Sequence, residues 1–210
     1  MTLTPDLLVS AYVQGAFPMA DADGEIGWYA PDPRAVLPLD AFRVPRSLAQ
    51  VVRAGRYCVV TDADVEATIR ACAAPAPDRP ETWISEEIIA AYTALARLGL
   101  CHSVECHDAD GFAGGLYGVA LGGAFFGESM VSHRRDASKV ALVHLVERLR
   151  AGGFALLDVQ MSTPHLARFG VVEIRRRDYE RRLAAALRVP ADWHALDASP
   201  GRTGWSEAVR

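Results

Sequence analysis

The sequence predicts an α+β protein in which helices flank a mixed β-sheet. Three strand-like segments follow one another in the second half of the chain: 103–107, 112–121 and 124–130. The turns DADG and Gly122-Gly123 separate them, as in antiparallel strands joined by hairpins. A helix follows, and the mostly apolar segment 154–160 after it is typical of a buried central strand. Because a crossover helix feeds that strand, the sheet combines antiparallel and parallel pairs with a right-handed connection.

The first 80 residues predict a small region of helices and short strands. A helix begins at Pro5 and ends near Gly15, and a stretch rich in turns follows from residue 17 to 38. Segment 57–61 is expected to be a strand, and segment 62–74 places its apolar residues on one helical face. Prolines then mark a loop, where we expect the boundary to the next unit.

Two further helices organise the second unit. One begins after Ser85 and ends at Gly99. The other follows the third strand, is capped by Asp136 or Ser138, and ends at Gly152. Its apolar face follows the helical spacing i, i+3, i+4 and i+7: Leu142, Leu145, Val146 and Leu149.

Composition excludes several classes of protein. Half of the 210 residues are hydrophobic and 23% are charged, which is a globular composition, and the net charge of −4 argues against coating nucleic acid by bulk charge. No apolar run approaches the ~18–20 residues that a membrane span needs, and Met1–Pro5 does not begin a signal peptide. Four cysteines in this length do not form a disulfide scaffold. We expect a monomeric cytoplasmic protein with reduced thiols.

Asp158 and Gln160 are polar residues in an otherwise apolar strand. At positions i and i+2 they share one face, and polar groups buried there must be hydrogen-bonded or functional. A satisfied core network and a catalytic pair remain equally open on this observation. Glu128 follows two phenylalanines, so its carboxylate is a second candidate, because buried glutamates are uncommon without partners.

Two other groups of residues are candidate binding sites. The pairs Cys101-His102 and Cys106-His107 flank one strand, where their side chains would point to different faces, so the spacing does not favour a metal site. Basic residues gather between the third strand and its following helix and again near residue 175: Arg134, Arg135, Lys139, Arg175 and Arg176. Such runs are usually solvated faces, and a rim that binds phosphate is the functional alternative.

A set of sequence blocks resembles one bacterial family throughout residues 7 to 180. In chain order the blocks are AYVQGAFPM, WYAPDPRAVLPL, FRVPRSL, TWIS, HSVE, GGLYGVALGGAFFGESM, DASKVALVHL, LLDVQ and RRRDY. They resemble leucyl/phenylalanyl-tRNA–protein transferases. The resemblance implies transfer of leucine or phenylalanine, and methionine more weakly, from Leu-tRNA or Phe-tRNA to an N-terminal Arg or Lys of a protein, which marks that protein for degradation. It implies no cofactor and no metal.

The resemblance also implies a fold and roles for individual residues. The family's catalytic domain is similar to the acetyltransferase (GNAT-like) fold, which we expect over 81–195, after a trimmed N-terminal α/β region over 1–80 and before a polar, frayed tail over 196–210. Catalytic roles fall on Gln160, Asp158 and Glu128. Leu116, Phe125 and Leu142 match the pocket for the transferred side chain. Matches to the site of the aminoacyl-tRNA 3′ end are Met19, Trp83, Leu145, Leu149 and Ser132.

The chain departs from the family pattern near the expected adenosine site. Met19 stands where many members have tryptophan, and Leu145 and Leu149 stand where others have phenylalanine, so this pocket is expected to be aliphatic rather than stacked. Two alternatives have different consequences. An acyl-CoA N-acetyltransferase would need a glycine-rich turn for pyrophosphate, whereas residues 129–138 contain no glycine. A non-catalytic tRNA-binding module would bind its ligand without forming product.

Overall fold

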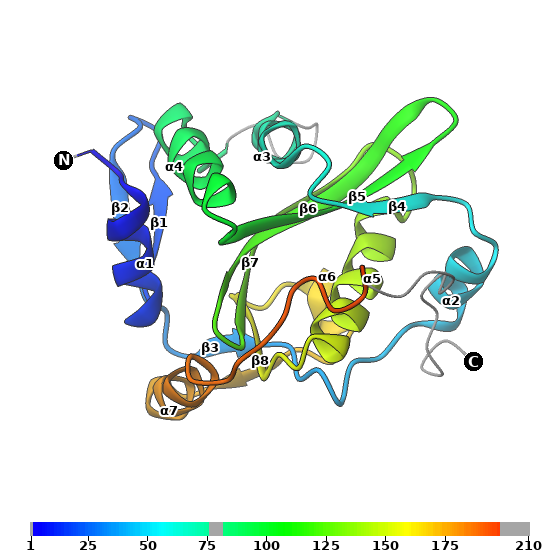
Figure 1. Cartoon of the computed structure of the whole chain (residues 1–210). Helices are drawn as coiled ribbons and strands as arrows, with labels where there is room; N and C mark the ends of the chain where they lie inside the picture. Colours follow the sequence, from blue (N-terminus) through cyan, green and yellow to red (C-terminus); the bar gives the residue numbers. More distant parts are fainter. Residues whose placement is uncertain (1, 76–81, 198–210) are drawn as a thin grey trace.

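A seven-stranded mixed sheet forms the centre of the computed structural model, which describes residues 2–75 and 82–197. Across the sheet the strands are β4 (Cys58–Thr61), β5 (Cys101–Asp108), β6 (Gly111–Leu121), β7 (Ala124–Ser132), β8 (Leu156–Gln160), β3 (Arg34–Val36) and β9 (Val172–Ile174). The pair β7–β8 is parallel and the other neighbours are antiparallel. The predicted α+β class and mixed sheet are therefore confirmed (Figure 1).

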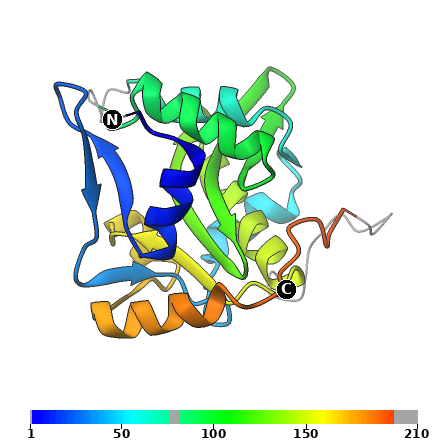
Figure 2. The same ribbon diagram turned by 60° about the vertical axis from the view of Figure 1, so that its left-hand side comes forward.

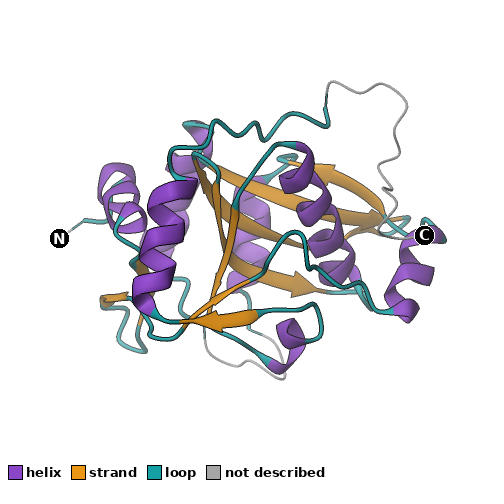
Figure 3. Cartoon of the chain, turned by 90° about the horizontal axis from the view of Figure 1, so that it is seen from below, coloured by secondary structure: helices purple, strands orange, loops and turns teal. Residues whose placement is uncertain are grey.

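Helices cover both faces of the sheet and create two hydrophobic cores. One core lies beneath α1 (Pro5–Val13), α3 (Val65–Ala73) and α4 (Glu86–Arg97), and the other lies beneath α2 (Arg46–Arg53) and α5 (Ala137–Ala151). The strands lie between these two sets of helices when the chain is seen from below (Figure 3). The short α6 (Pro164–Ala167) follows β8, and α7 (Arg176–Ala186) follows β9.

The N-terminal residues form part of the framework of the second half of the chain. A separate hairpin of β1 (Phe17–Ala20) and β2 (Ile26–Tyr29) packs beside α1 (Figure 2). Strands β3 and β4, however, belong to the large sheet, so residues on both sides of the expected boundary at residue 80 contribute strands to the same sheet. The predicted tail, 196–210, lies almost wholly outside the described residues.

The parallel pair β7–β8 is short, and its end creates an opening in the sheet. The two strands pair from Ala124 to Phe126 on β7 and from Leu156 to Asp158 on β8. Beyond that point β7 continues beside β6 alone, with a register shift between Tyr117 and Gly118. Irregularities of this kind bend a strand and redirect its side chains. Here the bend leaves room between β7 and β8 for a pocket.

The start of α5 confirms Asp136 as the cap residue, although another side chain makes the hydrogen bond to the first turn. Asp136 occupies the cap position with φ of 68°, but its side chain makes no capping hydrogen bond. Instead the Ser132 hydroxyl accepts a hydrogen bond from the Ser138 backbone N–H at 3.0 Å, and the Asp136 carboxylate binds Lys139 at 2.6 Å. The predicted end is confirmed, with Gly152 at the cap and Gly153 at φ of 73°.

Within the described parts of the chain, we find no helix with the length and apolar character of a membrane span.

Gly118 and Gly127 are paired across β6 and β7, and we expect alanine to destabilise the protein at Gly118 but not at Gly127. A Cβ on Gly118 would collide with the Phe126 carbonyl oxygen and lie 2.5 Å from Cε1 of Phe125, whereas a Cβ on Gly127 meets only the Asp158 carbonyl oxygen, at 3.5 Å. Gly118→Ala should lower the free energy of unfolding by about 1–3 kcal/mol, and Gly127→Ala should leave it within about 1 kcal/mol. Urea denaturation measures both, and equal losses would contradict the packing argument.

Candidate functional site

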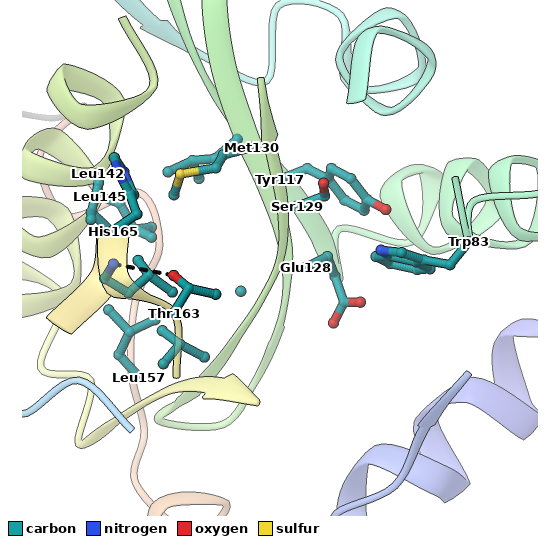
Figure 4. A pocket seen from close by; sticks show the side chains of 14 residues that line it. Trp83, Tyr117, Glu128, Ser129, Met130, Leu142, Leu145, Leu157, Thr163 and His165 are labelled. Atoms are coloured by element: carbon teal, nitrogen blue, oxygen red, sulfur yellow. Dashed lines mark hydrogen bonds between the residues drawn. The ribbon is translucent and has the colours of Figure 1, made fainter. Parts of the chain in front are cut away.

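A cavity of about 280 Å³ opens where β7 and β8 separate. Its apolar wall combines side chains of β6, β7, β8, α5 and α6: Leu116, Met130, Leu142, Leu145, Leu157, Val159 and Leu166. Trp83, Tyr117 and Glu128 line it as well. Figure 4 shows Leu142, Leu145 and Leu157 at one end and Trp83 with the Glu128 carboxylate at the other. The cavity therefore suits a ligand with an apolar side chain and a polar head.

Glu128 is the acidic group of this cavity, and three side chains bind its carboxylate. Tyr12 donates to Oε1 at 2.6 Å, the Gln160 amide Nε2 donates to the same oxygen at 3.0 Å, and the Tyr92 hydroxyl lies 3.3 Å from Oε2. The two tyrosine hydroxyls are also hydrogen-bonded to each other. Burial raises the pKa of Glu128 to about 7, against the opposing effect of the Tyr12 and Gln160 hydrogen bonds. The carboxylate can thus gain or lose a proton near neutral pH.

Gln160 has an unusual backbone conformation at the end of β8. Its φ is 64°, in the left-handed region, and the Met161 N–H donates to the Val159 carbonyl oxygen at 2.7 Å. Together these features form a tight three-residue turn centred on Gln160. A non-glycine residue held in such a conformation costs on the order of 1–3 kcal/mol, so surrounding contacts must maintain it.

Asp158 supplies one of those contacts and is itself fully enclosed. Its Oδ1 accepts the Gln160 backbone N–H at 2.8 Å. The Arg34 guanidinium grips both carboxylate oxygens, with Nε 2.9 Å from Oδ1 and Nη2 2.7 Å from Oδ2, and the Tyr179 hydroxyl donates to Oδ2 at 2.7 Å. Asp158 is 0% exposed. Its link to Gln160 therefore runs through the backbone, and it does not line the cavity.

The structure brings together only some of the residues expected in the aminoacyl site. Leu116, Leu142, Leu145 and Trp83 line the cavity. Four of the expected residues do not line it, and neither do Gln160 and Asp158. Phe125 is fully buried and stacks on Trp193 at 5.5 Å, Leu149 lies in the core beneath α5, and Met19 packs against the core beneath α1. The fourth, Ser132, uses its hydroxyl to accept the Ser138 backbone N–H at the start of α5. Phe125 shares the core beneath α5 with Leu116 and Leu142, but its ring packs on Phe154 and Trp193 and does not reach the cavity.

The expected basic rim is also divided by the structure. Arg135 and Lys139 line a second cavity of about 750 Å³, whose other basic residues are Arg56, Arg168 and His165. His165 lines both cavities, so the two adjoin. Arg134 lies near the carboxylates of Asp108 and Asp110. Arg175 begins α7, and Arg176 donates to the Ala30 carbonyl, so neither contributes to this cavity.

Four residues of the polar network escaped the sequence interpretation: Tyr12, Arg34, Tyr92 and Tyr179. Tyr12 and Tyr92 fit the apolar stripes of α1 and α4, where aromatic residues usually fill the core. Arg34 carried a signal, since an arginine beside the apolar run AVL must find a partner if the strand is buried. Which partner it finds depends on strand pairing over 124 residues.

No group of three or more potential metal ligands occurs among the residues that the structure describes. The two Cys-His pairs have structural contacts instead. His102 pairs with Asp62 at 2.8 Å and stacks on Trp193 at 4.4 Å, and the Cys106 thiol donates to the Ala137 carbonyl oxygen at 3.3 Å.

Comparison with known proteins identifies the family. A family model described as leucyl/phenylalanyl-tRNA protein transferase matches residues 36–184, and the model of that family's N-terminal domain matches residues 1–32. A leucyl/phenylalanyl-tRNA–protein transferase of Rubrobacter xylanophilus is 62% identical over 190 residues, which cover 90% of this chain and 97% of that protein. One from Salinibacter ruber is 55% identical over 195 residues, covering 92% and 84%. The chain therefore belongs to the leucyl/phenylalanyl-tRNA–protein transferase family.

Proposed function

We propose that the protein transfers leucine or phenylalanine, and methionine more slowly, from an aminoacyl-tRNA to the α-amino group of an N-terminal Arg or Lys of a protein. One observation carries the assignment beyond family membership. The apolar cavity ends at Glu128, and Glu128 is hydrogen-bonded to Gln160. An aminoacyl group needs both an apolar wall for its side chain and polar groups for its amine and ester.

The reaction is aminolysis of an ester. The acceptor nitrogen forms a bond to the aminoacyl carbonyl carbon, the bond from that carbon to the terminal ribose oxygen breaks, and a proton passes from the amine to the leaving oxygen. No cofactor is needed, because an ester is higher in free energy than the amide that replaces it. The protein's task is therefore to hold the two substrates in alignment.

Gln160 is suited to align the attacking amine. Its Nε2 is already committed to Glu128, and Oε1 has no hydrogen-bond donor among the described residues. A carbonyl oxygen can accept a hydrogen bond from a neutral amine as that amine approaches the ester. The ionised Glu128 carboxylate would hold a substrate amino group. Asp158 then acts as a positioning residue, since its oxygens are occupied by Arg34, Tyr179 and the Gln160 backbone.

The side-chain pocket is expected to discriminate weakly among apolar residues that have no branch at Cβ. Leu116, Leu142 and Leu145 are aliphatic, and contacts of this kind distinguish substrates by about 1–3 kcal/mol per methylene. Leucine and phenylalanine should therefore be accepted, methionine more slowly, and β-branched residues least.

We further propose a GNAT-like classification, a cytoplasmic location and a monomeric state. The order β5–β6–β7–α5–β8 with a parallel final pair supports the classification. An acyl-CoA acetyltransferase is less favoured, because the Ser132 hydroxyl already occupies a backbone N–H at the start of α5, where a pyrophosphate would bind. Tight binding of CoA in calorimetry would reverse that preference.

A mass-shift assay tests the proposed function. Purified protein is incubated with Leu-tRNA or Phe-tRNA and with peptides that begin with Arg, Lys or Ala. We expect the mass of one Leu or Phe residue to be added to the Arg and Lys peptides and not to the Ala peptide. Binding of tRNA without any product would instead support a non-catalytic module.

The pH dependence of kcat/KM tests the role of Glu128. Its pKa is raised to about 7, so the carboxylate is mostly protonated at pH 6 and ionised at pH 8. The acceptor amine must also lose a proton, with a pKa of about 8. The logarithm of kcat/KM should therefore rise with pH at a slope of about 2 below pH 7, and at a slope of about 1 in Glu128→Gln. The same slope in both proteins would show that ionisation of Glu128 does not contribute to the pH dependence.

The second cavity is proposed to hold phosphates of the tRNA 3′ strand. Arg56→Glu and Arg168→Glu should each raise the KM for aminoacyl-tRNA about tenfold at low salt, because glutamate repels the phosphate that arginine attracts. The KM for an aminoacyl-adenosine donor, which has no phosphate, should not change. Arg97→Glu reverses an exposed charge on α4 and is the matched control. Equal effects on both donors would contradict this placement.

A further inference from the structure

Arg34 and Tyr179 form a clamp around Asp158 that the aminoacyl-transfer reaction does not touch directly. Arg34 lies in β3, is 1% exposed, and donates to both Asp158 oxygens. Its remaining nitrogen, Nη1, donates to the Gly15 carbonyl oxygen at 3.0 Å. The guanidinium is also sandwiched between the rings of Phe17 and Tyr179, at 4.8 and 4.7 Å from their centres.

This clamp fixes the direction of the Asp158 carboxylate. A bidentate arginine holds the plane of a carboxylate, which a lysine cannot do because its ammonium is a point charge. The Tyr179 hydroxyl donates a further hydrogen bond to Oδ2, at 2.7 Å, from another side of the carboxylate. In this orientation Oδ1 faces the backbone N–H of Gln160, at 2.8 Å.

Gln160 depends on that hydrogen bond because its backbone is strained. A φ of 64° is unfavourable for glutamine, and β8 has a register shift against β3 at this point. If Asp158 rotated, the Gln160 N–H would lose its acceptor and the turn would relax toward extended backbone. The amide would then lose its hydrogen bond to Glu128, the carboxylate that lines the cavity.

We propose that Arg34 and Tyr179 are positioning residues for the transfer reaction, which hold the strained turn at Gln160 through Asp158 and so place the Gln160 amide against the reacting groups. The proposal rests on the proposed function for its kinetic consequence. It has a structural consequence that does not depend on activity.

Kinetics test the proposal with conservative variants of the full chain. Tyr179→Phe keeps the ring on Arg34 and removes the hydroxyl, and Arg34→Lys keeps the charge and removes the fork. Each should lower the single-turnover rate about 10- to 100-fold, as misplaced reacting groups do, with the KM for aminoacyl-tRNA changed less than about twofold. Arg150→Lys is the matched control. It also removes a pair of hydrogen bonds from one guanidinium, here to the Leu39 carbonyl oxygen, and it lies outside this network.

A double-mutant comparison separates positioning from general stability. If Arg34 acts through Gln160, then Arg34→Lys should have little further effect on the rate in a Gln160→Ala background. A loss of the same factor in both backgrounds, or a wild-type rate in both Arg34→Lys and Tyr179→Phe, would overturn the proposal. Where Arg34→Lys fails to fold, Tyr179→Phe and its double variant with Gln160→Ala carry the test.

Hydrogen exchange gives the readout that is independent of activity. In NMR measurements the Gln160 and Met161 amides should exchange at least about tenfold faster in Tyr179→Phe and Arg34→Lys, and at the wild-type rate in Arg150→Lys. Unchanged exchange would overturn the clamp even if the wild-type chain transfers amino acids. Conversely, faster exchange in a chain that transfers nothing would support the clamp and reject the proposed function.

Discussion

The buried ion pair between Arg34 and Asp158 connects parts of the chain that are far apart in sequence. Arg34 lies in β3 and Asp158 in β8, and the same guanidinium reaches the Gly15 carbonyl and the rings of Phe17 and Tyr179. Removing one partner from such a pair leaves a buried charge and costs about 3–5 kcal/mol. The N-terminal region, strand β8 and α7 are therefore held together at Asp158, two residues before Gln160.

The polar cluster and the apolar pocket depend on the same departure from regular sheet structure. After Asp158, β8 no longer pairs with β7, and the cavity opens between the two strands. Glu128 comes just after that point on β7, so its carboxylate is partly surrounded by protein and still reaches the cavity. This position raises its pKa and lets Tyr12, Tyr92 and Gln160 bind it.

Local chemistry was sufficient to predict most elements. Apolar spacing and glycine stops located α5, and the DADG and Gly122-Gly123 turns located the antiparallel strands. Asp158, Gln160 and Glu128 stood out because polar residues in apolar strands need partners. Phe125, which was expected in the pocket, packs on Trp193 in the core beneath α5. No local pattern indicates this contact, because the two residues are 68 positions apart.

By itself, the sequence determined the α+β class, the order of most strands and helices, and the family, because these depend on periodicity, turn chemistry and shared motifs. Only the tertiary structure decided that Arg34 and Tyr179 enclose Asp158, and that Asp158 reaches Gln160 through a backbone N–H. It also separated Arg135 and Lys139 from the other predicted basic residues. The physical reason is distance along the chain: hydrogen bonds between side chains depend on strand pairing and helix packing, which no local pattern specifies.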